Sequence, residues 1–132
     1  MGGRLFTEYK YADDQKYPYF YPVVGPRSGQ SVTTESSNPY PHHHSLFFGS
    51  DMVNGGNYWQ DGLERGRIVA QETRVDRAEG SAVEIFQTTL WSRPGAESPI
   101  RDTRRIRISA PSRDLRYIDF DVTLTPLIPV TI

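Results

Sequence analysis

The chain has 132 residues, with 15 lysines and arginines against 16 aspartates and glutamates, and it contains no cysteine. This length suits a single domain with a hydrophobic core. Because the charges nearly balance, nucleic-acid binding is not expected, and the lack of cysteine excludes disulfides, thiol catalysis and thiolate metal sites.

Hydrophobic and polar residues alternate with period two, and no 3.6-residue stripe is sustained, so we expect an all-β fold. A first strand is predicted over residues 5–11. Residues 17–22 are predicted as an edge strand or an extended rim, because Pro18 and Pro22 cannot donate ladder hydrogen bonds. Residues 25–41 have the composition of a loop, and residues 43–59 are predicted to form two short strands.

The second half predicts an antiparallel meander. Its four strands are expected over residues 66–76, 81–92, 100–109 and 115–124, with turn-forming residues between them. Residues 1–132 are therefore expected to form one antiparallel β-sandwich domain, or the N-terminal half of a larger one. The apolar end, residues 126–132, predicts a strand edge that a second copy covers in a homo-oligomer, or that a missing second half covers.

The hairpin of residues 100–124 has one apolar face and one charged face. Its turn brings Arg105 and Arg107 near Asp119 and Tyr117. Opposite charges across antiparallel strands contribute roughly 0.2–1 kcal/mol each, which accounts for these residues as surface pairs. The alternative is a ligand-binding groove, with Arg105 and Asp119 as contacts.

No apolar run reaches the roughly 18 residues that a membrane helix needs, and residues 1–8 do not have the pattern of a secretory signal. We therefore expect a soluble chain without membrane partners. The sequence does not indicate its compartment.

All three histidines are adjacent, at His42, His43 and His44. Histidine has the ordinary pKa nearest neutral pH and is the commonest metal ligand, so this triplet is the first candidate for chemistry. In an extended segment, His42 and His44 would point to one side and His43 to the other.

Three interpretations of the triplet remain open. The histidines can complete loop hydrogen bonding, contact a sugar-like ligand, or bind a metal with a carboxylate such as Asp51, Asp61 or Glu64, although that spacing matches no ligand motif. We predict no metal and no cofactor.

Residues 53–59, Val-Asn-Gly-Gly-Asn-Tyr-Trp, support a site next to the histidines. Asn54 can donate and accept hydrogen bonds, and Tyr58 and Trp59 have apolar faces suited to a sugar ring. The alternative is a glycine turn between strands, with Trp59 in the core. The tyrosines at positions 17, 19 and 21 are open to the same two interpretations.

The segments 19–22, 41–49, 53–55, 58–59, 66–68 and 103–121, and the sequence from Glu72 onward, together resemble the bacterial family labelled "methane oxygenase PmoA". The resemblance runs from about Leu5 to Leu124 and implies the N-terminal half of a longer protein. Members typically read Asp-His-Pro-His-His-Arg at the histidine run, so Pro39 and Tyr40 replace the Asp-His pair and His44 replaces the basic residue. A more distant similarity to galactose mutarotase-like sandwiches implies sugar binding on a sheet face.

Together these observations predict a carbohydrate-binding or carbohydrate-processing protein. In its enzymatic form, His42 or His43 exchanges a proton with a sugar hydroxyl or ring oxygen. The predicted ligand contacts are His44, Asn54, Tyr58, Trp59, Arg105 and Asp119. The alternatives are a non-catalytic structural or interaction module and a metal-dependent oxygenase or hydrolase.

Overall fold

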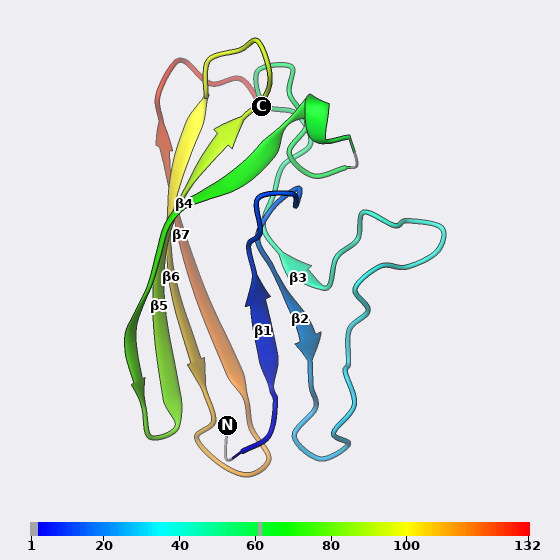
Figure 1. Ribbon diagram of the computed structural model, residues 1–132, viewed down its shortest axis with the longest axis vertical. Coiled ribbons are helices and arrows are strands. Elements are labelled where there is room, and N and C mark those ends of the chain that lie inside the picture. The colour runs from blue at the N-terminus through cyan, green and yellow to red at the C-terminus, as the bar shows by residue number, and fades with distance from the viewer. Residues whose placement is uncertain (1–2, 61) are drawn as a thin grey trace.

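A computed structural model of the protein describes residues 3–60 and 62–132, and these form two antiparallel sheets (Figure 1). The smaller sheet has the order β1-β2-β3 and the larger sheet the order β4-β5-β6-β7. A single 3₁₀ turn, η1 (Leu63–Arg65), precedes β4 in the described part of the chain. The predicted all-β class and antiparallel sandwich are confirmed. The strands are β1 (Thr7–Lys10), β2 (Tyr19–Val23), β3 (Leu46–Phe47), β4 (Arg67–Glu79), β5 (Ala82–Ser92), β6 (Ile100–Ser109) and β7 (Tyr117–Pro126).

The larger sheet is the predicted meander, in which each strand pairs with the next along the chain. Short turns that contain Gly80, Gly95 and Pro111 join the strands, which allows only antiparallel neighbours. β4 is an edge strand, and its register shifts twice, between Ala70 and Glu72 and between Val75 and Arg77.

The smaller sheet corrects the prediction for residues 17–22. β2 is the central strand of this sheet, not an edge strand. Its two prolines are compatible with this position. Pro18 precedes the strand, and Pro22 lies beyond the residues paired with β3 and at the register shift in the pairing with β1.

The prediction of two short strands over residues 43–59 is also wrong in part. β3 is formed, but the other segment makes an isolated bridge between Val53 and Gly56. The intervening Asn54 and Gly55 have φ of 49° and 74°, so the chain turns too tightly there to continue as a strand.

Two apolar clusters hold the sheets together. The lower cluster joins Phe6 and Phe20 of the small-sheet layer to Ile106 and Ile108 of β6. The upper cluster is rich in aromatic rings and surrounds Trp91 of β5. Its buried members are Tyr17, Tyr19, Val53, Tyr58, Ile68, Trp91 and Ile100.

A largely buried polar layer lies between these clusters. Asp102 and Arg104 of β6 are both 0% exposed, and they form a bidentate ion pair with N–O distances of 2.8 and 3.0 Å. The indole Nε1 of Trp91 donates to the same carboxylate at 2.8 Å. The Tyr9 hydroxyl of β1 accepts from Arg104 at 3.3 Å and donates to Gln87 at 2.6 Å. The layer therefore links both sheets through satisfied polar groups, as buried polar atoms require.

The arrangement determines the charge of Asp102. Burial alone would raise the pKa of its carboxyl, but hydrogen bonds and charge from Arg104 outweigh this, and the net effect is a lowered pKa. The carboxylate is therefore ionised and holds the Arg104 guanidinium in place.

Candidate functional site

The histidines lie on the long segment that joins β2 to β3, drawn in cyan in Figure 1. Ser45 closes this segment, because its backbone N–H donates to the Thr34 carbonyl at 3.0 Å and its hydroxyl donates to Thr33 at 2.7 Å. We call residues 34–45 the histidine loop. These two hydrogen bonds close the base of the loop before it reaches β3.

His44 packs inward on two tyrosines of the small-sheet layer. Its ring stacks on Tyr19 with centroids 5.1 Å apart and meets Tyr17 edge-on at 5.9 Å. Its Nδ1 lies 2.5 Å from the carbonyl oxygen of Glu35. Since a carbonyl oxygen can only accept, Nδ1 carries the hydrogen, and in the neutral ring Nε2 is an acceptor.

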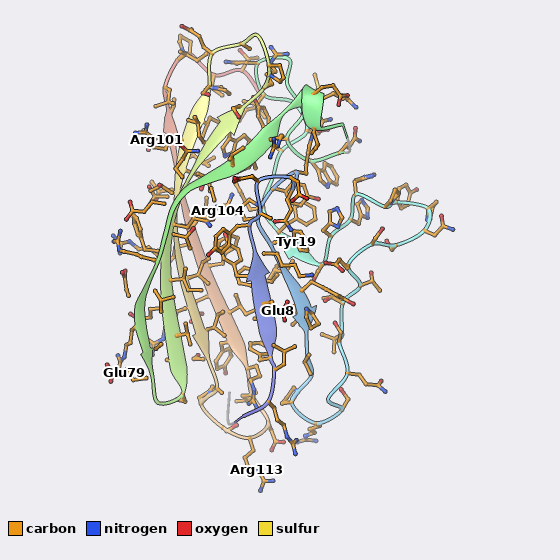
Figure 2. All side chains as sticks on the ribbon, in the orientation of Figure 1. Glu8, Tyr19, Glu79, Arg101, Arg104 and Arg113 are labelled. Atoms are coloured by element: carbon orange, nitrogen blue, oxygen red, sulfur yellow. The ribbon has the colours of Figure 1, made fainter. Side chains whose placement is uncertain are left out.

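The Glu35 side chain joins the histidine loop to the small sheet. Its Oε1 accepts from Lys10 Nζ at 2.5 Å and from the Tyr19 hydroxyl at 2.8 Å (Figure 2 labels Tyr19). The Lys10 hydrogen bond, followed by that of Tyr19, lowers the pKa of Glu35, and the same contact raises the pKa of Lys10. Lys10 and Glu35 remain partly exposed, so they form a polar site that solvent reaches.

His42 and His43 instead associate with the aromatic rings of Tyr40 and Trp59. His43 lies parallel to Trp59, at 8° and 5.9 Å, and stacks on Tyr40 at 24° and 5.1 Å. His42 meets His43 edge-on at 4.6 Å and Trp59 at 6.0 Å. We call Tyr40, His42, His43 and Trp59 the aromatic platform.

The triplet does not adopt the alternating arrangement that an extended segment would give. His42 and His43 share the aromatic platform, whereas His44 points to Tyr17 and Tyr19. The segment is a turn rather than a strand, because the His43 N–H donates to the Tyr40 carbonyl at 3.1 Å. The Tyr17 hydroxyl donates to the His42 carbonyl at 2.6 Å and so holds the backbone at the point where His44 turns away from His42 and His43.

Asn54 and Tyr58, two of the predicted ligand contacts, have other partners. The Asn54 side chain donates to the Pro129 carbonyl and accepts from the Thr131 N–H, so it anchors the C-terminal segment. Tyr58 is 0% exposed and packs on Trp91 in the core, which leaves no side-chain surface for a ligand. Homo-oligomer formation over the C-terminal edge stays a prediction.

Arg105 and Asp119 lie outside this site. They alternate with buried residues on β6 and with half-buried residues on β7, so they are on the outer face of the larger sheet. Arg107 is directly opposite Asp119, whereas Arg105 is opposite Asp121 and Tyr117 is opposite Ser109. Both side chains are exposed, and the face that they occupy is turned away from the sheet that carries the histidine loop.

Sequence reasoning missed Lys10, Glu35 and Tyr40. One signal was available, since Glu35 is the only carboxylate between Asp14 and Asp51 and therefore the only acid in a long polar loop. The tyrosines at positions 17, 19 and 21 were considered for core packing or for a site, and Tyr19 combines the two. Its ring is buried in the core, while its hydroxyl reaches Glu35.

A metal centre finds no support in the geometry. Across residues 3–60 and 62–132, no group of three histidine, aspartate or glutamate side chains is placed to hold a metal ion. Of the carboxylates considered from sequence, Asp61 lies outside the described residues. In the same two ranges, no helix is long and apolar enough to cross a membrane.

Comparison with known proteins assigns the family. Residues 1–132 match DUF6807, which is described as a family of unknown function. The chain belongs to the DUF6807 family. No curated protein and no solved structure matches this DUF6807 chain.

This match corrects the resemblance drawn from sequence. The family that covers the chain is DUF6807, and no PmoA-related family or relative matches. No solved structure matches the chain, so the more distant similarity to galactose mutarotase-like sandwiches is not supported either. The short motifs that suggested these families are aromatic, glycine and histidine runs, which a β-sandwich uses for turns and core packing as well as for a site.

Proposed function

We propose that this DUF6807 chain binds a carbohydrate at the histidine loop, with the aromatic platform as the contact surface. The observation that carries this proposal is the parallel placement of His43 and Trp59 next to Tyr40, which is 54% exposed. A sugar ring has apolar C–H faces that pack on such rings, and hydroxyls that need polar partners at the edge.

Suitable polar partners surround the platform. The Trp59 Nε1 is buried without a hydrogen-bond partner among the residues that the structure describes, so Trp59 offers a ligand its ring and not its N–H. The ring nitrogens of His42 and His43 can both donate and accept, as a hydroxyl requires. Further along the loop, His44 Nε2 and the Lys10–Glu35 pair add an acceptor, a cation and an anion.

Binding is better supported than proton transfer. No hydrogen bond or ion pair joins a carboxylate to His42 or His43 in the described part of the chain. A histidine that acts as general base is commonly oriented by a carboxylate or carbonyl partner on its other nitrogen. His44 has such a partner, but its ring packs on Tyr19 in the small-sheet layer.

The proposal is tested by titrating the protein with a panel of monosaccharides while following tryptophan fluorescence and histidine NMR shifts. We expect a saturable fluorescence change for at least one sugar, with shifts at His42 and His43 before other residues. Trp59→Phe leaves Trp91 as the only tryptophan, so the fluorescence change should disappear in that variant. No response to any sugar at millimolar concentration would refute carbohydrate binding.

A matched pair of variants separates a binding role from a structural one. His43→Ala should weaken sugar binding about tenfold, the loss of roughly one good contact, while Tyr117→Ala, an exposed aromatic residue on β7, should leave it unchanged. If instead His42→Ala and His43→Ala together change only stability, the loop is a structural element and the chain is a non-catalytic module.

A further inference from the structure

A second hollow lies at the end of the sandwich opposite η1, where residues 3–6, 24–32 and 110–116 meet (Figure 1). One cavity of about 380 Å³ is bounded mainly by Phe6, Val32, Leu115 and other apolar side chains. A neighbouring cavity of about 330 Å³ shares Phe6 and Arg116 with it. We call the two together the basal hollow. These volumes fall within the roughly 300–1,000 Å³ range of small-molecule sites.

The charge around the basal hollow differs from that of the whole chain. The charged residues that line it are Arg4, Arg116 and Asp114, and the segments that meet there also carry Arg27 and Arg113, although the chain has a net charge of −1. Figure 2 shows Arg113 at this end of the molecule. Asp114 is already bonded to Arg27, at 2.9 Å. The local potential is therefore positive around an apolar surface.

Arg116 is the charged group best placed to meet a ligand. It lines both cavities and is partly buried. Its Nη1 donates to the carbonyls of Ser112 and Leu115, at 2.8 and 2.7 Å, which fixes the guanidinium. Within the described residues no carboxylate pairs with it, so its remaining N–H groups can form a charge-assisted contact.

The walls of the hollow are already formed. The Val24 N–H donates to the Phe6 carbonyl at 2.8 Å, and Val32 donates to Val23 at 2.8 Å, which holds the 24–32 loop against β1 and β2. The Arg27–Asp114 contact then connects this loop to the 110–116 turn. Because these walls are already ordered, a ligand would lose little binding free energy to ordering them.

We propose that the basal hollow binds a small amphipathic anion, an aliphatic chain that ends in a carboxylate. The chain would cover Phe6, Val32 and Leu115, of which Val32 is 71% exposed and Leu115 48%. The carboxylate would meet Arg116, because a guanidinium matches a carboxylate in geometry and charge. This site is separate from the histidine loop and does not depend on the carbohydrate proposal.

The test uses 8-anilinonaphthalene-1-sulfonate, an amphipathic anion that fluoresces in apolar sites, followed by displacement with decanoate. We expect saturable dye binding and displacement by decanoate, with decanol of the same chain length at least tenfold weaker. Equal displacement by decanol would overturn the proposal, because it would show that charge is not recognised. Absence of dye binding and of decanoate-induced NMR shifts at residues 110–116 would overturn it as well.

Variants locate the site. Arg116→Gln and Leu115→Glu should each weaken decanoate binding about tenfold, roughly the effect of one charge-assisted contact. Arg101→Gln removes the same charge at the far end of the larger sheet, as Figure 2 shows, and should change nothing. Leu115 is half exposed, so its variant should fold even if the Arg116 variant does not. Binding to anionic vesicles with no response to free decanoate would overturn the proposal in favour of a lipid surface.

Discussion

The buried polar layer and the histidine loop are built from similar groups but differ in exposure. In the layer, Asp102, Arg104 and Trp91 lie on two paired strands, all are buried, and the carboxylate is bonded from two sides. In the loop, Lys10 and Glu35 are partly exposed, and His43 is exposed. Burial makes the first set a determinant of stability, whereas exposure leaves the second available to a ligand.

The largest expected effect comes from breaking the layer. Asp102→Asn leaves the Arg104 guanidinium buried without its counter-ion and should lower the free energy of unfolding by about 3–5 kcal/mol, measured by urea denaturation. Asp121→Asn, on an exposed position of β7, should stay within about 0.5 kcal/mol of the wild type. An equal loss in both variants would show that the layer has no special role.

The same carboxyl gives a pH signature. Because its pKa is lower in the folded state, Asp102 contributes stability above the unfolded pKa, near 4, and that contribution is lost as pH falls through the folded value. The acid-induced loss of stability should therefore be smaller in Asp102→Asn than in the wild type.

A smaller effect is expected at the edge of the layer. Burial raises the pKa of Tyr9 from 10.0 to about 12, although Arg104 partly opposes the shift. Because the folded pKa is above the unfolded one, Tyr9 contributes to the unfolding free energy below pH 10. This contribution, on the order of 2 kcal/mol, is lost as the pH rises toward 12. Tyr9→Phe should remove this alkaline dependence, measured as the difference in unfolding free energy from the wild type between pH 9 and 12. Tyr117→Phe, at an exposed position of β7, is the control, and it should keep the wild-type slope.

The smallest effect on stability is expected in the histidine loop. Glu35→Gln loses the ion pair with Lys10, and because both groups are partly exposed the cost should be under about 1 kcal/mol. The local effect should be larger, because amide hydrogens of residues 34–45 should exchange faster. Glu64→Gln, an exposed acid on η1, provides the comparison. Unchanged exchange in the Glu35 variant would mean that the backbone contacts alone hold the loop.

The regular strands were predictable because their signal is local. Alternation and turn residues identify four strands that the structure places at nearly the predicted positions, such as β6 at residues 100–109. The position of β2 was not predictable in this way, since it depends on Leu46 and Phe47 returning from a distant loop. The ion pair between Arg104 and Asp102 was not predicted, because alternation does not show which charges pair within a core.

The site shows the same limit. The histidine triplet and Trp59 were predicted to lie together, and His42 and His43 do contact Trp59. Glu35 contacts Lys10 and Tyr19, which are 25 and 16 residues away in the sequence, and no periodic pattern of residues predicts contacts at such separations. Asn54 and Tyr58 were predicted as ligand contacts from residue type alone, which does not reveal whether a polar group is used by the fold.

The two register shifts in β4 have a consequence for behaviour at high concentration. An outermost strand of 13 residues offers a long row of backbone groups that another copy could extend into a fibril. Each shift interrupts that row and bends the strand, and Arg74, flanked by its ion pairs with Glu72 and Asp76, puts charge along the same stretch. β4 is thereby a poor template for cross-β growth, and replacing Arg74 and Asp76 with valines should make the protein precipitate more readily.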